Sequence, residues 1–332
     1  MVLGRVATSR MHSWAKKLYI GLALCGVLVI VAAFVSVVFN KGSLLGEGSS
    51  PKQLKKQNQV YDEARFDTAS PIDNQKSLAL SATAFISVYV DTSGKETILI
   101  EQNKDRELPI ASMTKLTVAL VASEQHADHD VIVISKDALA LKGGSGLYTA
   151  GDSLYFSDSL HAVLIASHNE VASSIANGVS FIDAMNAKAS SLHLTHTHYV
   201  NPTGLDPEGG SDSINESTAF DMYTLMRYLK EHNPEILRIT TEKTFELKTK
   251  DGTFVDSLKS TNVLLGDSDL PFMILGGKTG ETPRAKQNLG LITKSPCRGE
   301  IVSVVMGSAN SFADMKQLLQ YDENSFIWTC YK

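Results

Sequence analysis

The chain has 332 residues, of which 43% are hydrophobic and 20% charged, a composition typical of a folded globular protein and not of a disordered one. Its formal net charge is −5, with acidic and basic residues intermixed, so no basic surface for nucleic acid is expected.

The first long feature along the chain is an uncharged apolar run at residues 18–39. About 22 residues at about 1.5 Å each suffice to cross a bilayer as a helix. Basic residues precede the run and only Lys41 follows it closely, so residues 1–17 are expected in the cytoplasm and the rest outside the cell membrane. A cleaved signal peptide remains an alternative, and a lipoprotein signal ending at Cys25 is a weaker one because Leu24 is bulky for that position.

Residues 40–77 are rich in Gly, Ser, Lys, Gln and Asn, which predicts a solvated linker, and a single folded domain is expected over residues 78–332. Cys297 and Cys330 would then lie in an oxidising compartment. A disulfide between them and two separate thiols are both compatible with the sequence.

The domain begins with two runs rich in β-branched residues, 84–91 and 96–102, joined by a turn that indicates a β-hairpin. Helical periodicity follows at residues 113–124, 157–166, 171–176, 181–192 and 218–231. Strand patterns return at 244–247, 272–277, 288–293 and 300–307, before a final helix at 312–321. Strands at both ends with helices between them predict an α+β fold whose sheet is assembled from distant segments.

Three short strings occur in one order along this domain: Ser112-Met-Thr-Lys115, Ser167-His-Asn169 and Lys278-Thr-Gly280. Together they supply a nucleophile with an amine one helical turn away, a polar pair in a turn, and a cation on a strand, as serine acyl transfer requires. Each string is weak alone, since Ser-x-x-Lys also occurs at Ser13 and Ser49. The prediction of a serine acyl-transfer site therefore rests on their order and on their occurrence together.

Ser112 follows an extended segment and opens a predicted helix, which places Lys115 on the same helix face. To act as a base, the amine must be neutral for part of the time, which requires burial or a nearby cation such as Lys278. The structural alternative is a capping serine followed by a surface lysine. For Ser167 and Asn169, the alternative is a helix cap between two core helices.

Other constellations are less well supported. A phosphate loop is excluded at Lys278 because Phe272 stands where its leading glycine is required. A Ser-His-Asp hydrolase would need a Gly-x-Ser-x-Gly elbow, and none is present. The spacing of His193, His196 and His198 fits no common zinc motif, so neither a metal nor a cofactor is expected.

The ordered strings resemble those of serine-type D-alanyl-D-alanine carboxypeptidases, the low-molecular-mass penicillin-binding proteins of peptidase family S11. Further similar strings are Pro109-Ile-Ala-Ser-Met-Thr-Lys-Leu116, Phe181-Ile-Asp-Ala-Met-Asn186, Asn201-Pro-Thr-Gly-Leu205 and Ser217-Thr-Ala-Phe-Asp221. The resemblance covers roughly residues 79–321. It implies the β-lactamase/DD-peptidase-like fold, an antiparallel sheet flanked by helices with a helical subdomain.

The resemblance also implies roles. Ser112 would attack the penultimate D-Ala carbonyl, Lys115 would take its proton, Ser167 would pass a proton to the leaving amine, and Asn169 would position the substrate. Substrate binding would fall to Lys278, Thr279, Gly280 and Glu281, with an oxyanion site at the amides of Ser112 and Glu281. The implied partners are peptidoglycan stem peptides as substrate and β-lactam antibiotics as inhibitors.

The chain departs from the family pattern at His168, Glu170 and Glu281, and also at Ala285-Lys286, where the family commonly has Ala-Gly. Two alternatives to a carboxypeptidase stay open: a serine β-lactamase, and a non-catalytic penicillin-recognising or wall-binding module, which the unusual residues around Lys278 favour. Endopeptidase action on cross-links is a variant that the motifs do not separate from carboxypeptidase action.

Overall fold

The structure is a computed structural model that describes residues 67–331, except 74–76, 177–178, 208 and 210–212. The expected cytoplasmic segment, the membrane anchor at residues 18–39 and nearly all of the expected linker lie outside the described residues. Among the helices that are described, none combines the length and the apolar character needed to cross a membrane.

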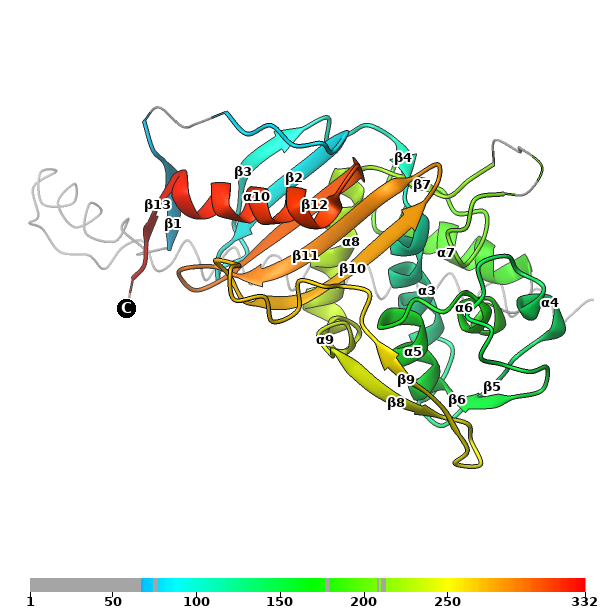
Figure 1. Cartoon of the computed structure of the whole chain (residues 1–332). Coiled ribbons are helices and arrows are strands. Elements are labelled where there is room, and N and C mark those ends of the chain that lie inside the picture. Colours follow the sequence, from blue (N-terminus) through cyan, green and yellow to red (C-terminus); the bar gives the residue numbers. More distant parts are fainter. Residues whose placement is uncertain (1–66, 74–76, 177–178, 208, 210–212, 332) are drawn as a thin grey trace, which may run out of the picture. The chain divides into compact units, whose positions relative to one another are not determined.

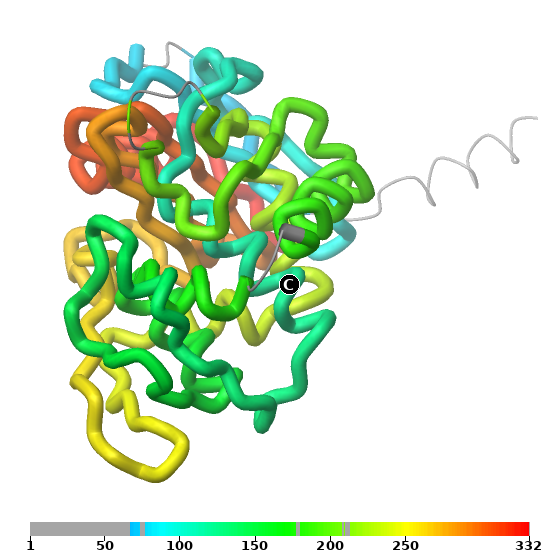
Figure 2. The backbone as a smooth tube through the Cα atoms, turned by 90° about the vertical axis from the view of Figure 1, so that its right-hand side faces the viewer, coloured from blue at the N-terminus to red at the C-terminus, as the bar shows by residue number. Residues whose placement is uncertain are grey.

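A five-stranded antiparallel sheet forms the centre of the domain, in the order β10-β11-β12-β2-β3 (Figure 1). Its strands are β2 (Ala84–Val90), β3 (Glu96–Gln102), β10 (Ile274–Thr282), β11 (Lys286–Lys294) and β12 (Glu300–Ser308). Strand β2 pairs with β12, so the first hairpin joins the last three strands. Figure 2 shows these cyan and orange-to-red segments together, although they come from opposite ends of the described chain. The predicted α+β class and the assembly of the sheet from distant segments are confirmed.

Both faces of the sheet are apolar. Successive side chains of a strand point to opposite faces, and in β2 the apolar residues lie on both of them without alternating with polar ones. In β2, Ile86 and Val88 belong to one buried cluster, whereas Phe85 and Tyr89 belong to the other. Helix α8 (Ala219–His232) contributes Met222 and Leu225 to the first cluster, and α10 (Ser311–Asn324) contributes Met315 and Leu318 to the second. The sheet is thus a layer between helices.

The helical subdomain lies next to the β10 edge of the sheet (Figure 1). It contains α3 (Thr114–Ser123), α5 (Phe156–Leu164), α6 (Asn169–Ile175) and α7 (Val179–Ser191). Shorter elements connect these parts: β4 (Leu108–Pro109), η1 (Ala111–Met113), β5 (Val131–Val133), α4 (Lys136–Leu139), β6 (Ser153–Tyr155), β7 (Glu216–Ser217) and α9 (Pro234–Ile239).

Two strands differ from expectation. The run predicted at 272–277 is β10, which begins at Ile274 and continues to Thr282, so Lys278-Thr-Gly280 lies inside the strand. The strand predicted at 244–247 forms as β8 (Thr244–Lys248), but it pairs with β9 (Phe254–Lys259) in a separate hairpin and is not part of the central sheet.

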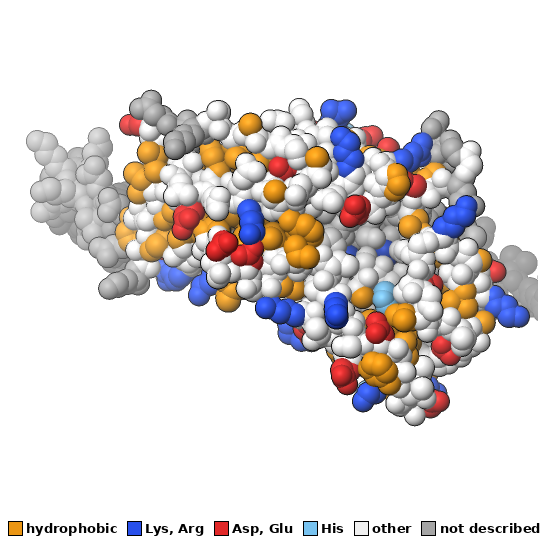
Figure 3. Space-filling model, in the orientation of Figure 1, with side chains coloured by type: hydrophobic (Ala, Val, Ile, Leu, Met, Phe, Trp, Pro, Cys, Tyr) orange, Lys and Arg blue, Asp and Glu red, His pale blue; other side chains and the backbone are white. Residues whose placement is uncertain are grey.

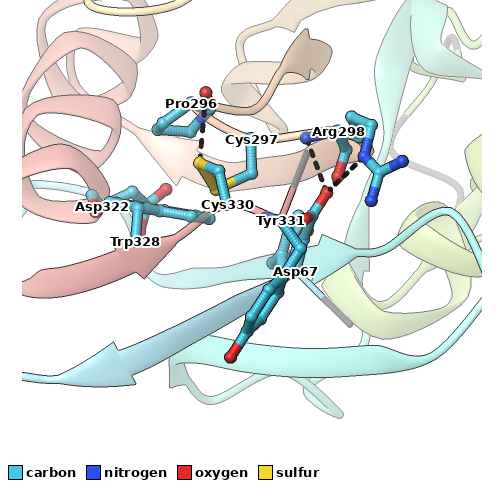
Figure 4. The surroundings of a disulfide bond; sticks show 9 residues. Asp67, Pro296, Cys297, Arg298, Asp322, Trp328, Cys330 and Tyr331 are labelled. Carbon is cyan, nitrogen blue, oxygen red and sulfur yellow. Dashed lines mark hydrogen bonds and ion pairs between the residues drawn. A yellow bond between two sulfur atoms is a disulfide. The ribbon is translucent and has the colours of Figure 1, made fainter. Parts of the chain in front are cut away.

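The described domain begins earlier than residue 78. Strand β1 (Thr68–Pro71), within the expected linker, pairs with β13 (Phe326–Thr329) near the carboxyl end. Asp67 accepts hydrogen bonds from the Arg298 backbone N–H at 3.0 Å and from the Tyr331 N–H at 2.8 Å (Figure 4). Residues 67–71 are therefore bound to the domain and are not a solvated linker.

Cys297 and Cys330 form a disulfide beside this strand pair (Figure 4). The bond ties the turn between β11 and β12 to the end of the chain. Of the two possibilities that the sequence left open, the structure has the disulfide.

Candidate active site

Ser112 lies in the 3-10 turn η1, directly before α3, where an extended segment was predicted to give way to a helix. Two glycines let neighbouring backbone come close to this turn. A Cβ on Gly280 of β10 would lie 3.2 Å from Ser112 N and 2.6 Å from Ile110 O, and one on Gly204 would lie 1.9 Å from Ala111 O. The nucleophile is thus enclosed between the sheet edge and the 201–205 loop because both positions lack side chains.

Lys115, on the first turn of α3, has no exposed surface and makes three polar contacts. Its Nζ lies 2.8 Å from Ser112 Oγ, 2.7 Å from Asn169 Oδ1 and 2.7 Å from the carbonyl oxygen of Thr203. A capping serine followed by a surface lysine is therefore not what the structure contains.

The Lys115 amine is held toward its neutral form. Burial, and next the positive charge of Lys278, hold the pKa of Lys115 well below its ordinary value, while the Glu170 carboxylate raises it. Burial also lowers the pKa of Lys278 itself, to about 7. Lys115 is consequently neutral, and able to accept a proton, at lower pH than an ordinary lysine.

The three contacts also orient the amine. The Thr203 oxygen is a carbonyl and can only accept a hydrogen bond. The Asn169 amide is fixed in direction, because its Nδ2 donates to the Gly143 carbonyl at 2.8 Å, which leaves Oδ1 as an acceptor facing Lys115. A neutral amine has two hydrogens and one lone pair. In the structure Nζ donates to Ser112 Oγ. In the neutral amine, Thr203 and Asn169 take the two hydrogens, which leaves the lone pair for the Ser112 hydroxyl.

Ser167 lies at the turn between α5 and α6 with a left-handed backbone (φ 62°). Lys278, which is 1% exposed, donates from Nζ to Ser167 Oγ at 3.0 Å and to the Thr279 carbonyl at 3.1 Å. Because Lys278 donates to the oxygen, the Ser167 hydroxyl hydrogen is available to another acceptor.

These groups border a cleft of about 230 Å³ between β10, the helical subdomain and the start of α10. Its lining includes five of the eight site residues predicted from sequence: Ser112, Ser167, Thr279, Gly280 and Glu281. Figure 3 shows basic side chains (blue) and histidine (pale blue) at a hollow between the sheet and the helices. Lys115, Asn169 and Lys278 complete the set through the hydrogen bonds given above. All eight predicted residues are brought together.

Several contributors were missed by sequence reasoning. Thr261 and Phe312 line the cleft, and the Thr261 hydroxyl lies 2.6 Å from that of Thr279. The Thr203 carbonyl and the Gly143 carbonyl act through backbone atoms, which any residue carries. The Asn201-Pro-Thr-Gly-Leu205 string was the one signal for Thr203, and the sequence alone gave it no role.

The departures from the family pattern also have places in the structure. His168 Nδ1 lies 2.6 Å from the hydroxyl of Tyr148, and burial lowers the pKa of His168. Glu281 borders the cleft and accepts a hydrogen bond from Gln287 at 3.5 Å. In the histidine tract, His196 contacts Glu107 at 2.9 Å.

Comparison with known proteins supports one family. Residues 71–310 match the model of the D-alanyl-D-alanine carboxypeptidase family, peptidase family S11. A D-alanyl-D-alanine endopeptidase of Pseudomonas aeruginosa is 28% identical over 73% of this chain and 78% of its own length. The D-alanyl-D-alanine carboxypeptidase DacC of Escherichia coli is 33% identical over 69% of this chain, but the match spans only 58% of that relative.

Solved structures have the same fold. Penicillin-binding protein D2 of Listeria monocytogenes, in its cefotaxime-bound form, matches with a TM-score of 0.64 and 27% identity, over 75% of this chain and all (100%) of that one. Its ampicillin-bound form matches with a TM-score of 0.62 and 26% identity. With the family model matched across all three motifs, the chain belongs to the S11 family of D-alanyl-D-alanine carboxypeptidases.

Proposed function

We propose that this protein is a serine carboxypeptidase that removes the terminal D-alanine from peptidoglycan stem peptides ending in D-Ala-D-Ala, and that penicillins acylate it. The observation that carries the proposal is the 2.8 Å contact between Ser112 Oγ and the fully buried amine of Lys115. Two further observations support it. Relatives carry this activity in their names, and a related structure holds cefotaxime.

Acylation begins when Ser112 Oγ attacks the carbonyl carbon of the penultimate D-Ala and its proton passes to the lone pair of Lys115. The tetrahedral oxyanion would be held by the backbone amides of Ser112 and Glu281. When the C–N bond breaks, the proton that Lys115 took from Ser112 passes through Ser167 to the leaving amine, free D-Ala departs, and Lys115 is neutral again. An ester on Ser112 remains.

Binding of the substrate carboxylate would fall to Lys278 and to the Thr279 hydroxyl, with Gly280 letting the peptide backbone approach β10. Deacylation reverses the roles: a water gives a proton to Lys115 as its oxygen attacks the ester, and the Ser112 hydroxyl is restored. A β-lactam enters the same path through opening of its ring. The ring amine stays attached to the acyl group and does not diffuse away.

One experiment separates this proposal from its alternatives. The protein is incubated with labelled penicillin and, separately, with a peptide ending in D-Ala-D-Ala. Durable label with D-Ala release supports the peptidase, whereas rapid loss of label indicates a β-lactamase. Absence of both signals would favour a non-catalytic penicillin-recognising or wall-binding module.

Endopeptidase action is favoured as a second candidate by one specific finding, the match to 78% of a D-alanyl-D-alanine endopeptidase. A cross-linked muropeptide dimer tests it. Release of monomers at a rate comparable to D-Ala release would assign both activities to the cleft.

We further propose that residues 18–39 anchor the protein in the cell membrane with its catalytic domain on the outer side. The uncharged run supports this placement, and so does the disulfide, since such bonds persist in oxidising compartments. Membrane fractionation tests the anchor, and protease treatment of intact cells tests the side. Recovery of the full-length protein in the soluble fraction would contradict it.

A further inference from the structure

A glycine loop, residues 142–147, is held against the start of α6 by consecutive residues of the second motif. Asn169 Nδ2 donates to the Gly143 carbonyl at 2.8 Å. Glu170 Oε1 accepts from the N–H of Ser145, from its hydroxyl at 2.9 Å and from the N–H of Gly146 at 3.3 Å. Asn169 of the motif and its neighbour Glu170 thus both form hydrogen bonds with the same loop.

Burying the Glu170 carboxylate costs free energy, because the charged group loses its contact with water. Its residue is 2% exposed, and Oε2 has no hydrogen-bond partner among the described residues. A buried carboxylate is stable only when donors compensate it, so it holds the loop amides strongly. The packing is close as well, because a Cβ on Gly144 would lie 2.7 Å from Glu170 Oε1.

The loop in turn acts on the base. Gly143 sets the direction of the Asn169 amide, which makes Oδ1 an acceptor for a Lys115 hydrogen and leaves the lone pair of Lys115 for Ser112. If the Gly143 carbonyl moved away, the Asn169 amide would be free to flip and present its NH₂ to Lys115. The lone pair of Lys115 would then be drawn away from the nucleophile.

We propose that Glu170 is a positioning residue for acyl transfer: its carboxylate fixes the glycine loop, through which Gly143 and Asn169 direct the lone pair of Lys115 at Ser112. The inference rests on the proposed function and extends it to a residue outside the three motifs.

Glu170 also acts through its charge. Two charged groups influence Lys115, namely Lys278 from β10, which lowers its pKa, and Glu170 from α6, which raises it. Around Glu170 itself lie His168 and Tyr148, and Asp256 of β9 influences both of them. Neutralising Glu170 removes a negative charge near Lys115, so the pKa of Lys115 falls further and its neutral form persists to lower pH.

The test measures the rate of acylation by labelled penicillin across pH, so that peptide turnover is not required. We expect Glu170→Gln to acylate about tenfold more slowly, because the loop loses its carboxylate. We also expect the acid limb of its pH profile to move to lower pH. Gly144→Ala forces the loop and the Glu170 carboxylate apart but keeps the charge, so it should slow acylation with the acid limb in place.

Asp152→Asn is the matched control. Asp152 accepts from the Thr149 N–H at 2.7 Å and from its hydroxyl at 2.9 Å, so it holds the turn that follows the glycine loop by the same chemistry. It is not among the groups that influence the pKa of Lys115. We expect its acylation rate and acid limb to match the wild type.

Three outcomes overturn the inference. The first is a Glu170→Gln variant as fast as the wild type. The second is a Glu170→Gln variant that acylates more slowly but keeps the acid limb of the wild type. That result is expected if the carboxylate has only a structural role. The third is a Gly144→Ala variant with the wild-type rate. If the wild type itself takes no label, the proposed function fails and the inference fails with it; circular dichroism of each variant confirms that its fold is intact.

Discussion

Lys278 Nζ donates to Ser167 Oγ at 3.0 Å, and so joins two motifs that lie 111 residues apart in the sequence. The same ammonium lowers the pKa of Lys115. Lys278 is therefore placed to act on the base as well as on Ser167.

Replacing Lys278 by methionine removes the charge while filling the same buried space. Without the cation, the pKa of Lys115 rises toward its ordinary value, so more alkaline conditions are needed to make it neutral. We expect the acid limb of penicillin acylation to move to higher pH, opposite to Glu170→Gln, and the KM for D-Ala-D-Ala peptides to increase. An acid limb that stays in place in the Lys278→Met variant would show that Lys278 does not tune the base.

Gly204 tests the enclosure of the nucleophile. A Cβ at this position would lie 1.9 Å from Ala111 O, so Gly204→Ala must displace the turn that carries Ser112. We expect acylation to fall about a hundredfold, because misplacement by about 1 Å has this effect on a reacting group. Gly252→Ala is the control, since Gly252 has a similar left-handed backbone (φ 89°) but nothing within 4 Å of its Cβ position. Equal rates for the two variants would contradict the steric account.

The disulfide between Cys297 and Cys330 is expected to stabilise the domain without serving the cleft. It closes a 33-residue separation, and loss of such a bond costs about 2–4 kcal/mol of unfolding free energy. Urea unfolding of Cys330→Ser should show that decrease, while the acylation rate stays at the wild-type value. Wild-type protein treated with a reductant should behave like the variant. Unchanged stability in both would exclude a stabilising role.

Asp322 predicts a pH dependence of stability. It lies on α10 against β2, where the Ser87 hydroxyl donates to it at 2.6 Å, and burial raises its pKa from 3.8 to about 8. The unfolded chain releases this proton above about pH 4, whereas the folded chain keeps it until about pH 8, so its contribution to stability is present at acid pH and is lost as the pH rises. Asp322→Asn should flatten the unfolding free energy between these limits. A slope equal to the wild type would assign the dependence to other groups.

Much of the fold could be predicted because the core strands and helices have strong periodic patterns. The strand predicted at 96–102 forms with those bounds as β3, and the predicted helix at 218–231 is α8, shifted by one residue. The β1–β13 pair was missed, since its four-residue strands depend on Asp67 and on contacts with the distant carboxyl end.

The sequence predicted which residues form the site but not how their side chains are oriented. Side-chain motifs predicted that Ser112, Lys115 and Asn169 come together, and hydrogen bonds join them in the structure. The acceptors that orient them are the carbonyls of Thr203 and Gly143, and backbone atoms leave no mark on residue identity. The tuning of the base by Glu170 needed coordinates for the same reason.

The most direct test of the account is the position of the covalent bond. The protein is mixed with penicillin, quenched in acid and digested, and the acylated peptide is sequenced by mass spectrometry. We expect the acyl group on Ser112 alone, with none in a Ser112→Ala variant that keeps its circular dichroism spectrum. Acylation of another residue, or persistent labelling of Ser112→Ala, would contradict a mechanism that starts at this hydroxyl.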